Sequence, residues 1–147
     1  AYEIRLSLVG SEMCIRDRSI DGHRYVFDVC HNAQGADFFI NELKLRNITP
    51  DFIVCGMFRN KDHAQVYLKM AEKIKAEWVL INTVGIRGFS SDELRKGMAV
   101  NAVCLTCFDE ARSYIKQNVK EQSTILAFGS FNVLEQACTS IGAVRIC

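Results

Sequence analysis

Polar and charged side chains follow an apolar run of this chain at three places, and the first of these is the turn after Phe27. Asp28 ends the run, and His31 and Asn32 follow at the start of a segment with helical period. A carboxylate can accept hydrogen bonds from sugar hydroxyls, and the start of a helix favours anions. A simpler interpretation is that Asn32 only caps the helix while Asp28 holds the turn.

The second place is the segment 56–63, which reads Gly-Met-Phe-Arg-Asn-Lys-Asp-His. Gly56 predicts a sharp turn of the backbone after a strand. Lys61 can meet a phosphate or a carboxylate as a point charge. A lysine beside an acid at the start of a helix is also typical of ordinary solvated surface.

The third place is the segment 128–132, where Gly129 and Ser130 stand between an apolar run and a helical segment. The backbone N–H groups and the hydroxyl at such a junction can bind an anion. Ser130 has no base beside it in the sequence, so we do not interpret it as a nucleophile. As an ordinary helix cap it would need no function.

The elements that must position these residues alternate along the chain from Ser19 onward. Short β-branched or aromatic runs are separated by segments of helical period, which predicts an α/β domain with a Rossmann-like, mostly parallel sheet and helices on both faces. The ligand crevice of such a sheet lies beyond the carboxyl ends of its strands, so the three places should come together there. The expected strands are 24–29, 52–57, 78–81, 100–105 and 124–128.

The expected helices are defined by apolar residues at helical spacing. Asp21 and Gly22 predict a hairpin turn before the first strand, and Ser90 to Glu93 has capping-box spacing at the start of a helix through Met98. The inward positions of the other helices are Ala36, Phe39, Ile40 and Leu43; Ala64, Tyr67, Leu68, Ala71 and Ile74; Ala111, Tyr114 and Ile115; and Val133, Leu134 and Ala137.

Composition favours a single globular domain that acts on a small molecule or a protein. The chain has 147 residues, 49% hydrophobic and 24% charged, with a net charge of +1. This balance gives no excess of positive charge of the kind that binds nucleic acid or an anionic membrane. The sequence contains neither an apolar run approaching the roughly 20 residues that span a bilayer nor a secretory leader, so we expect a cytoplasmic protein with no membrane partner.

The seven cysteines are expected to be reduced thiols. Several lie in apolar runs, where a thiol acts as a small hydrophobe. Cys104 and Cys107 have CxxC spacing, but a zinc site would need a second pair of cysteines or histidines, and no metal site is predicted. A redox role for this pair is a distant alternative.

Residues 1–18 resemble a peptide that arises when sequencing-library adaptor DNA is translated by mistake, most clearly over Ser7 to Asp17. The segment fits neither a clean helix nor an alternating strand that pairs with anything downstream. We therefore predict that residues 1–18 are non-native and that the domain covers residues 19–147. The alternative is a genuine first strand.

Four motifs together resemble one family. They are Asp-x-x-His-Asn at 28–32, Gly-Met-x-x-x-Lys-Asp at 56–62, Arg87 before a helix, and Phe-Gly-Ser-Phe at 128–131. In this order and spacing they are similar to the C-terminal domain of folylpolyglutamate synthases and dihydrofolate synthases, within the Mur ligase superfamily. The resemblance covers Ser19 to about Ala137. The Asp-x-x-His-Asn turn alone would indicate only the wider superfamily.

The resemblance implies part of an ATP-dependent ligase. Such enzymes activate a carboxylate of folate or dihydropteroate as an acyl phosphate, which the amino group of L-glutamate then attacks. It implies that Asp28 contacts the ATP ribose and that Asn32 and Arg87 bind substrate. It also implies that three residues act at the acyl phosphate by positioning and charge stabilisation. These candidate catalytic residues are His31, Ser130 and Lys61.

The sequence departs from the family in ways that matter for activity. Ala33 stands where proline is frequent, which costs little because proline is dispensable at a first helical position. The phosphate-binding loop, the Mg²⁺ ligands and most of the folate pocket belong to an N-terminal ATPase domain, and this chain contains no GxxxxGK[ST]. An interdomain arginine would fall within residues 1–18. We therefore expect ATP and Mg²⁺ as cofactors, that ATPase domain as a partner, and an inactive fragment.

Two other readings fit part of the pattern. Another Mur-type ligase, which joins an amino acid to a peptidoglycan precursor, shares the Asp-x-x-His-Asn turn, although the segments at 56–62 and 128–131 favour the folate branch. A non-catalytic Rossmann-like binding module would also give the βαβ pattern. The chain lacks a G-x-G-x-x-G turn after its first strand, which argues against dinucleotide binding.

Overall fold

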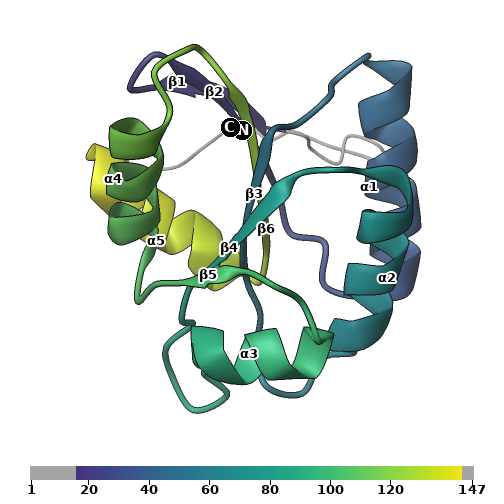
Figure 1. Ribbon diagram of the computed structural model, residues 1–147. Coiled ribbons are helices and arrows are strands. Elements are labelled where there is room, and N and C mark those ends of the chain that lie inside the picture. The colour runs from purple at the N-terminus through teal and green to yellow at the C-terminus, as the bar shows by residue number, and fades with distance from the viewer. Residues whose placement is uncertain (1–15, 144–147) are drawn as a thin grey trace.

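The computed structural model describes residues 16–143, which form six strands and five helices (Figure 1). Residues 1–15 and 144–147, which include Cys14, Cys147 and most of the segment predicted to be non-native, lie outside the described residues. The strands are β1 (Arg16–Ile20), β2 (His23–Asp28), β3 (Phe52–Gly56), β4 (Glu77–Leu80), β5 (Val103–Cys104) and β6 (Thr124–Gly129). The helices are α1 (Ala33–Leu45), α2 (His63–Lys73), α3 (Ser91–Met98), α4 (Phe108–Asn118) and α5 (Phe131–Ile141).

The strands form one sheet in the order β1-β2-β6-β3-β4-β5. Every pair is parallel except β1 with β2. The last strand, β6, therefore lies between the first two parallel strands. Helices α1, α2 and α3 pack on one face, and α4 and α5 pack on the other (Figure 1). The predicted fold class, a mostly parallel Rossmann-like sheet with helices on both faces, is confirmed.

Alternation along the central strands divides the core into two clusters. On β6, Leu126 and Phe128 point to the side of α1, α2 and α3, whereas Ile125 and Ala127 point to the side of α4 and α5. All four are completely buried. Because successive side chains of a strand point to opposite faces, a strand covered on both faces must be apolar throughout, and the runs at 52–57 and 124–128 show this pattern.

The first two strands form a hairpin. Asp21 and Gly22 both have positive φ angles, 56° and 80°, which is the conformation of a type I′ turn and confirms the predicted hairpin turn. Arg16, Asp17 and Arg18 pair with Phe27, Val26 and Tyr25. These three residues of the segment 1–18 thus do pair with a strand downstream, contrary to the expectation from their pattern. Whether the segment is native stays a prediction.

Two expected elements differ from the structure. Helix α2 buries His63, Val66 and Met70, so the predicted stripe of Ala64, Tyr67, Leu68, Ala71 and Ile74 was wrong in part, although Tyr67 and Ile74 do pack against the core. Ala64 and Leu68 are exposed. The His63 ring stacks on Phe89 with 4.7 Å between centroids, which helps to bury this histidine. The strand expected over 100–105 is only the two-residue β5.

Candidate functional site

The carboxyl ends of β2, β6 and β3 lie side by side. Asp28, the last residue of β2, pairs with Phe128 of β6, and Gly129 pairs with Gly56, the last residue of β3. Helices α1 and α2 leave this edge toward one face of the sheet, while α5 leaves toward the other. A change of direction of this kind opens a crevice at the strand ends. The structure thus brings together the strand ends at which the three groups of predicted polar residues begin.

Gly129 makes the close approach of β6 to β3 possible. Its φ is 131°, and a Cβ atom there would overlap the Gly56 carbonyl oxygen. The Ser130 N–H donates to that same oxygen at 3.0 Å. The prediction of a sharp turn at Gly56 was wrong, because Gly56 ends a regular strand and is tightly packed against Ile81 and Val133. The backbone conformation that requires glycine lies on the neighbouring strand β6, at Gly129.

Asp28 carries a carboxyl that is largely removed from water. Burial raises its pKa to about 6, although a hydrogen bond from the Val29 N–H at 2.8 Å and the positive charge of Arg16 act in the opposite direction. One carboxylate oxygen, Oδ1, accepts the Val29 bond. A carboxyl with a raised pKa at the crevice of an α/β sheet is a functional-site candidate.

His31 and Ser130 each hold a buried polar atom without a protein partner. These atoms are His31 Nδ1 and Ser130 Oγ, and they are two of the three such side-chain atoms among the described residues. Ser130 is 3% exposed and stands at the N-cap of α5, yet its hydroxyl makes no capping bond. Because a buried polar atom without a partner is costly, both atoms fit a site that a ligand completes.

Asn32 has a structural role that the structure describes fully. It is the N-cap of α1, and its Oδ1 accepts a hydrogen bond from the Gly35 N–H at 2.7 Å. This is the capping interpretation that the sequence also allowed. Its side-chain amide N–H groups remain available, so a substrate-binding role for Asn32 stays a prediction.

Lys61 and Arg87 lie on two neighbouring loops, which follow β3 and β4. Lys61 is half-buried and precedes Asp62, the N-cap of α2. Arg87 is exposed, and its guanidinium carbon lies 5.8 Å from the centroid of the Phe58 ring. The Arg59 N–H donates to the Arg87 carbonyl at 2.9 Å, so the two loops are joined. Neither cation contacts Asp28 or Ser130 through a described hydrogen bond or ion pair.

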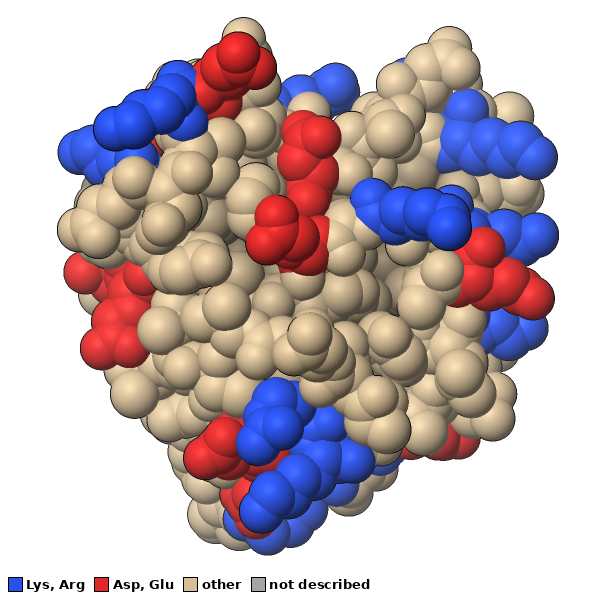
Figure 2. All heavy atoms as spheres, in the orientation of Figure 1, with Lys and Arg blue, Asp and Glu red and all other residues tan. Residues whose placement is uncertain are grey.

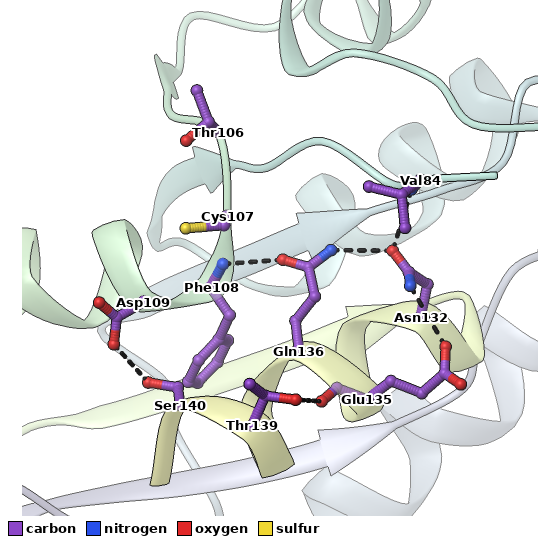
Figure 3. A pocket seen from close by; sticks show the side chains of 10 residues that line it. All are labelled: Val84, Thr106, Cys107, Phe108, Asp109, Asn132, Glu135, Gln136, Thr139 and Ser140. Atoms are coloured by element: carbon purple, nitrogen blue, oxygen red, sulfur yellow. Dashed lines mark hydrogen bonds between the residues drawn. The ribbon is translucent and has the colours of Figure 1, made fainter.

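A pocket of about 490 Å³ opens at the same edge of the sheet, between α4 and α5 (Figure 3). None of its lining residues is a predicted site residue. Gln136 spans its floor: its Oε1 accepts from the Phe108 N–H at 2.9 Å, and its Nε2 donates to Asn82 O and Asn132 Oδ1, both at 2.8 Å. These bonds use both N–H groups and one acceptor position of the Gln136 amide, and they connect α5 to the first residue of α4.

The cysteines show no site for a metal or a disulfide within the described part of the chain. Cys104 and Cys107 are free thiols, and the Cys104 thiol donates weakly to Ser91 O at 3.6 Å. Over residues 16–143 we find no group of three or more His, Cys, Asp and Glu side chains that could hold a metal ion. The same part of the chain has no helix long and apolar enough to cross a membrane.

Sequence reasoning missed three features of this edge: the close approach at Gly129, the packing of Arg59 against the loop that holds Arg87, and the network around Gln136. Only Gly129 left a signal, because a glycine between an apolar run and a serine often marks close backbone contact. The other two depend on residues 28 or more positions apart in the chain.

Comparison with known proteins gives one relative by sequence. The chain is 30% identical over 112 residues to a dihydrofolate synthase/folylpolyglutamate synthase from Buchnera aphidicola subsp. Schizaphis graminum, an alignment that covers 74% of this chain and 26% of that protein. No family model matches the chain. The chain thus spans about a quarter of the length of this relative.

Solved structures share the fold. A bifunctional folylpolyglutamate synthase/dihydrofolate synthase from Yersinia pestis, complexed with AMPPNP and a Mn ion, superposes with a TM-score of 0.74 at 21% identity, over 95% of this chain and 36% of that one. The Helicobacter pylori folylpolyglutamate synthetase gives a TM-score of 0.63 at 17% identity, over 96% of this chain and 33% of that one.

Proposed function

We propose, on the premise that this chain is a domain related to the dihydrofolate synthase/folylpolyglutamate synthases, that it forms the C-terminal part of an ATP-dependent ligase. The ligase joins L-glutamate to folate, to dihydropteroate or to both, through an acyl phosphate. The observation that carries the proposal is the convergence of Asp28, His31 and Ser130 at adjacent strand ends, with two buried polar atoms that have no protein partner.

Asp28 suits the ribose of ATP. Its carboxyl is largely buried at the end of β2, and one oxygen accepts a hydrogen bond from the Val29 N–H at 2.8 Å, which fixes the direction of the group. Ribose hydroxyls are hydrogen-bond donors that stabilise the ionised carboxylate, so bound nucleotide should lower the raised pKa of Asp28. The Yersinia relative is complexed with AMPPNP and a Mn ion. The described residues here include no group of three or more His, Cys, Asp and Glu side chains that could hold a metal ion, so in this proposal Mg²⁺ is held mainly by another part of the ligase.

His31, Ser130 and Lys61 would act on the reacting groups. His31 Nδ1 and Ser130 Oγ lack partners in the protein, so each can bond to a substrate oxygen or nitrogen without first breaking a bond. Lys61 contributes a positive charge from the neighbouring strand end, where negative charge develops as the acyl phosphate forms and is attacked. Chemistry then proceeds by orientation and electrostatics, with no covalent intermediate on the protein.

The test compares the 147-residue chain with the parent protein that carries its natural upstream sequence. Incorporation of labelled L-glutamate into dihydropteroate or tetrahydrofolate with ATP is expected for the parent and not for the chain alone, because the chain contains no phosphate-binding loop. Turnover by the isolated chain would contradict the proposal. A transcript read across the junction between Arg18 and Ser19 would define that upstream sequence.

In the parent protein, Asp28→Ala is expected to raise the KM for ATP about tenfold or more, the cost of one charge-assisted hydrogen bond. The matched control is Asp37→Ala, since Asp37 is an exposed acid of α1 that pairs with Lys69 at 3.1 Å. Equal ATP dependence of the two variants would remove Asp28 from the nucleotide site.

A further inference from the structure

The loop after β3 and the loop after β4 each place an arginine against an aromatic ring of the other loop. The Arg59 guanidinium carbon lies 5.8 Å from the centroid of the Phe89 ring, and that of Arg87 lies 5.8 Å from the centroid of Phe58. Each cation thus rests on an aromatic ring of the other loop. Stacking of this kind restricts a long side chain that would otherwise sample many rotamers.

Hydrogen bonds from backbone and side-chain groups hold the two loops in the same arrangement. The Arg59 N–H donates to Arg87 O, and Arg59 Nη2 donates to Gly88 O, both at 2.9 Å. The loop after β4 is closed on itself by Thr83, whose N–H donates to Phe89 O at 3.0 Å and whose hydroxyl accepts from the Phe89 N–H at 3.0 Å. The same hydroxyl donates to Met57 O at 3.0 Å. These hydrogen bonds therefore fix the backbone of the two loops that carry Arg59 and Arg87.

The two guanidiniums keep most of their hydrogen-bonding capacity. Both residues are exposed, and a guanidinium has five N–H donors, of which Arg59 uses one within the described protein and Arg87 none. Over residues 16–143 neither forms an ion pair. The hydrogen bonds with Ser90 in the capping box lower the pKa of Glu93 most, and the charge of Arg59 adds to this, so that carboxylate already has its partners.

Positively charged side chains also gather at this end of the molecule. Figure 2 shows Lys and Arg side chains gathered at the end where α3 lies in Figure 1, with acidic side chains at the edge of the group. Lys61 lies on the same loop as Arg59, two residues further along the chain. Planar guanidiniums match carboxylates in a two-bond geometry that a lysine cannot provide.

We propose that Arg59 and Arg87 form a carboxylate clamp, which binds the free carboxylates of a glutamyl chain beside the ligation site. This assignment rests on the proposed function, because a γ-linked glutamyl product carries one free carboxylate for every residue added. A clamp next to the strand ends would hold a substrate that already bears glutamate while the next residue is joined.

The experiment titrates the 147-residue chain with γ-glutamyl-γ-glutamyl-glutamate and follows the backbone amide resonances by NMR. Shifts are expected in residues 57–62 and 83–89. Arg59→Ala should raise the Kd about tenfold, because it removes a charge-assisted bond. Arg59→Lys should recover only part of the affinity, because an ammonium lacks the planar fork.

Two further variants separate the clamp from general positive charge. Phe58→Leu keeps the net charge and removes the ring under Arg87, so it should weaken binding several-fold if stacking orients the cation. Arg95→Ala removes a nearby charge that is paired with Asp92 at 3.6 Å, and it should change the Kd by less than about twofold. Equal loss in Arg95→Ala and Arg59→Ala, or no shift in either loop, would overturn the clamp.

The result is separable from that of the proposed function. If the peptide does not bind but Asp28→Ala still raises the KM for ATP in the parent protein, only the clamp is wrong. If the peptide binds as expected but the parent protein does not join glutamate, the clamp stands as a site for acidic peptides and the ligase assignment fails. Displacement of the peptide by an equal concentration of inorganic phosphate would also overturn the clamp, because it would mark an unselective anion site.

Discussion

The Asp28 carboxyl is costly to keep ionised in the position where the chain holds it. Burial raises its pKa to about 6, against 3.8 for the unperturbed group. Between these two values the folded protein binds more protons than the unfolded chain, so stability falls as the pH rises from about 4 to 6 and the penalty is complete above that range. A group kept at such a cost is more readily explained by ligand binding than by stability.

We predict that Asp28→Asn stabilises the chain at neutral pH. The amide oxygen can still accept the Val29 N–H, while the buried charge is removed. The gain should be on the order of 2 kcal/mol at pH 7.5 and should vanish below about pH 4, where the aspartate is protonated in both states. Urea unfolding of both proteins at the two pH values measures this. Equal stability of the two proteins at pH 7.5 would contradict the burial argument.

Single residues also mark the limit of sequence reasoning at this site. The strand ends that precede these polar residues were predicted correctly to lie side by side, because the rule for parallel sheets depends only on where strands end. A sharp turn of the backbone was predicted at Gly56 and not at Gly129. The sequence does not distinguish the two positions, because both glycines follow an apolar run. Only strand pairing shows that β6 approaches β3 so closely that the second glycine must adopt a positive φ.

Two helices of the domain begin with serine, and the two serines differ in what they do. Ser90 and Glu93 form a complete capping box at the start of α3, with the Glu93 N–H donating to Ser90 Oγ and the Ser90 N–H to Glu93 Oε1, both at 3.1 Å. Ser130 occupies the same position in α5 without a side-chain bond. One hydroxyl therefore supports its helix, and the other has no partner among the described residues.

Alanine at the two positions should separate these roles. Ser90→Ala is expected to cost about 1 kcal/mol of the free energy of unfolding, the usual effect of losing a helix cap. Ser130→Ala should change stability by less than about 0.5 kcal/mol, because its buried hydroxyl has no bond to lose. Chemical denaturation of both variants decides the point. A loss at Ser130 as large as that at Ser90 would show that its hydroxyl has a structural partner.

At the level of elements, periodicity identified every helix but could not fix every buried face. In α3, the capping residues set the start, and the structure confirms it. In α2, the pattern correctly placed Tyr67 and Ile74 against the core but missed His63, which is buried while Leu68 is exposed. That histidine is buried by its stack on Phe89 and by a bond between Nε2 and Phe58 O at 2.8 Å, contacts that the sequence of the helix does not contain.

Across the whole molecule, Arg112 connects three segments that are distant in the chain. From α4 it donates to both carboxylate oxygens of Asp21 in the hairpin turn, at 2.7 and 3.1 Å. It also donates to the carbonyl and hydroxyl of Ser140 on α5, at 2.8 and 3.2 Å. The Arg112 hydrogen bonds, followed by its charge, lower the pKa of Asp21 despite partial burial. The hairpin is thereby fixed to the helical layer of one face.

Asp21→Asn should test this connection. We expect a loss of about 1 to 2 kcal/mol at neutral pH, because the Arg112 guanidinium loses a two-bond, partly buried partner, while asparagine still tolerates the positive φ. Since the folded pKa of Asp21 is lowered, the stabilisation is present above about pH 4 and is lost as the pH falls through that lower value.

The matched control is Asp17→Asn, because its ion pair with Arg24 leaves both side chains more than 40% exposed. That change should cost less than about 1 kcal/mol. Urea unfolding of both variants at pH 7 and pH 3 gives the comparison, and equal losses would mean that Arg112 adds nothing beyond surface charge.

The central place of β6 has a consequence for how the chain is synthesised. The strand that joins β2 to β3 is among the last parts of the domain to leave the ribosome, so a nascent chain holds two unpaired strand edges until about residue 129 is available. Long-range pairing of this kind slows folding and exposes edges that can pair with other chains. A chain that ends before Thr124 would therefore hold two half-sheets, each with an edge of unpaired backbone groups, rather than a smaller version of the same domain.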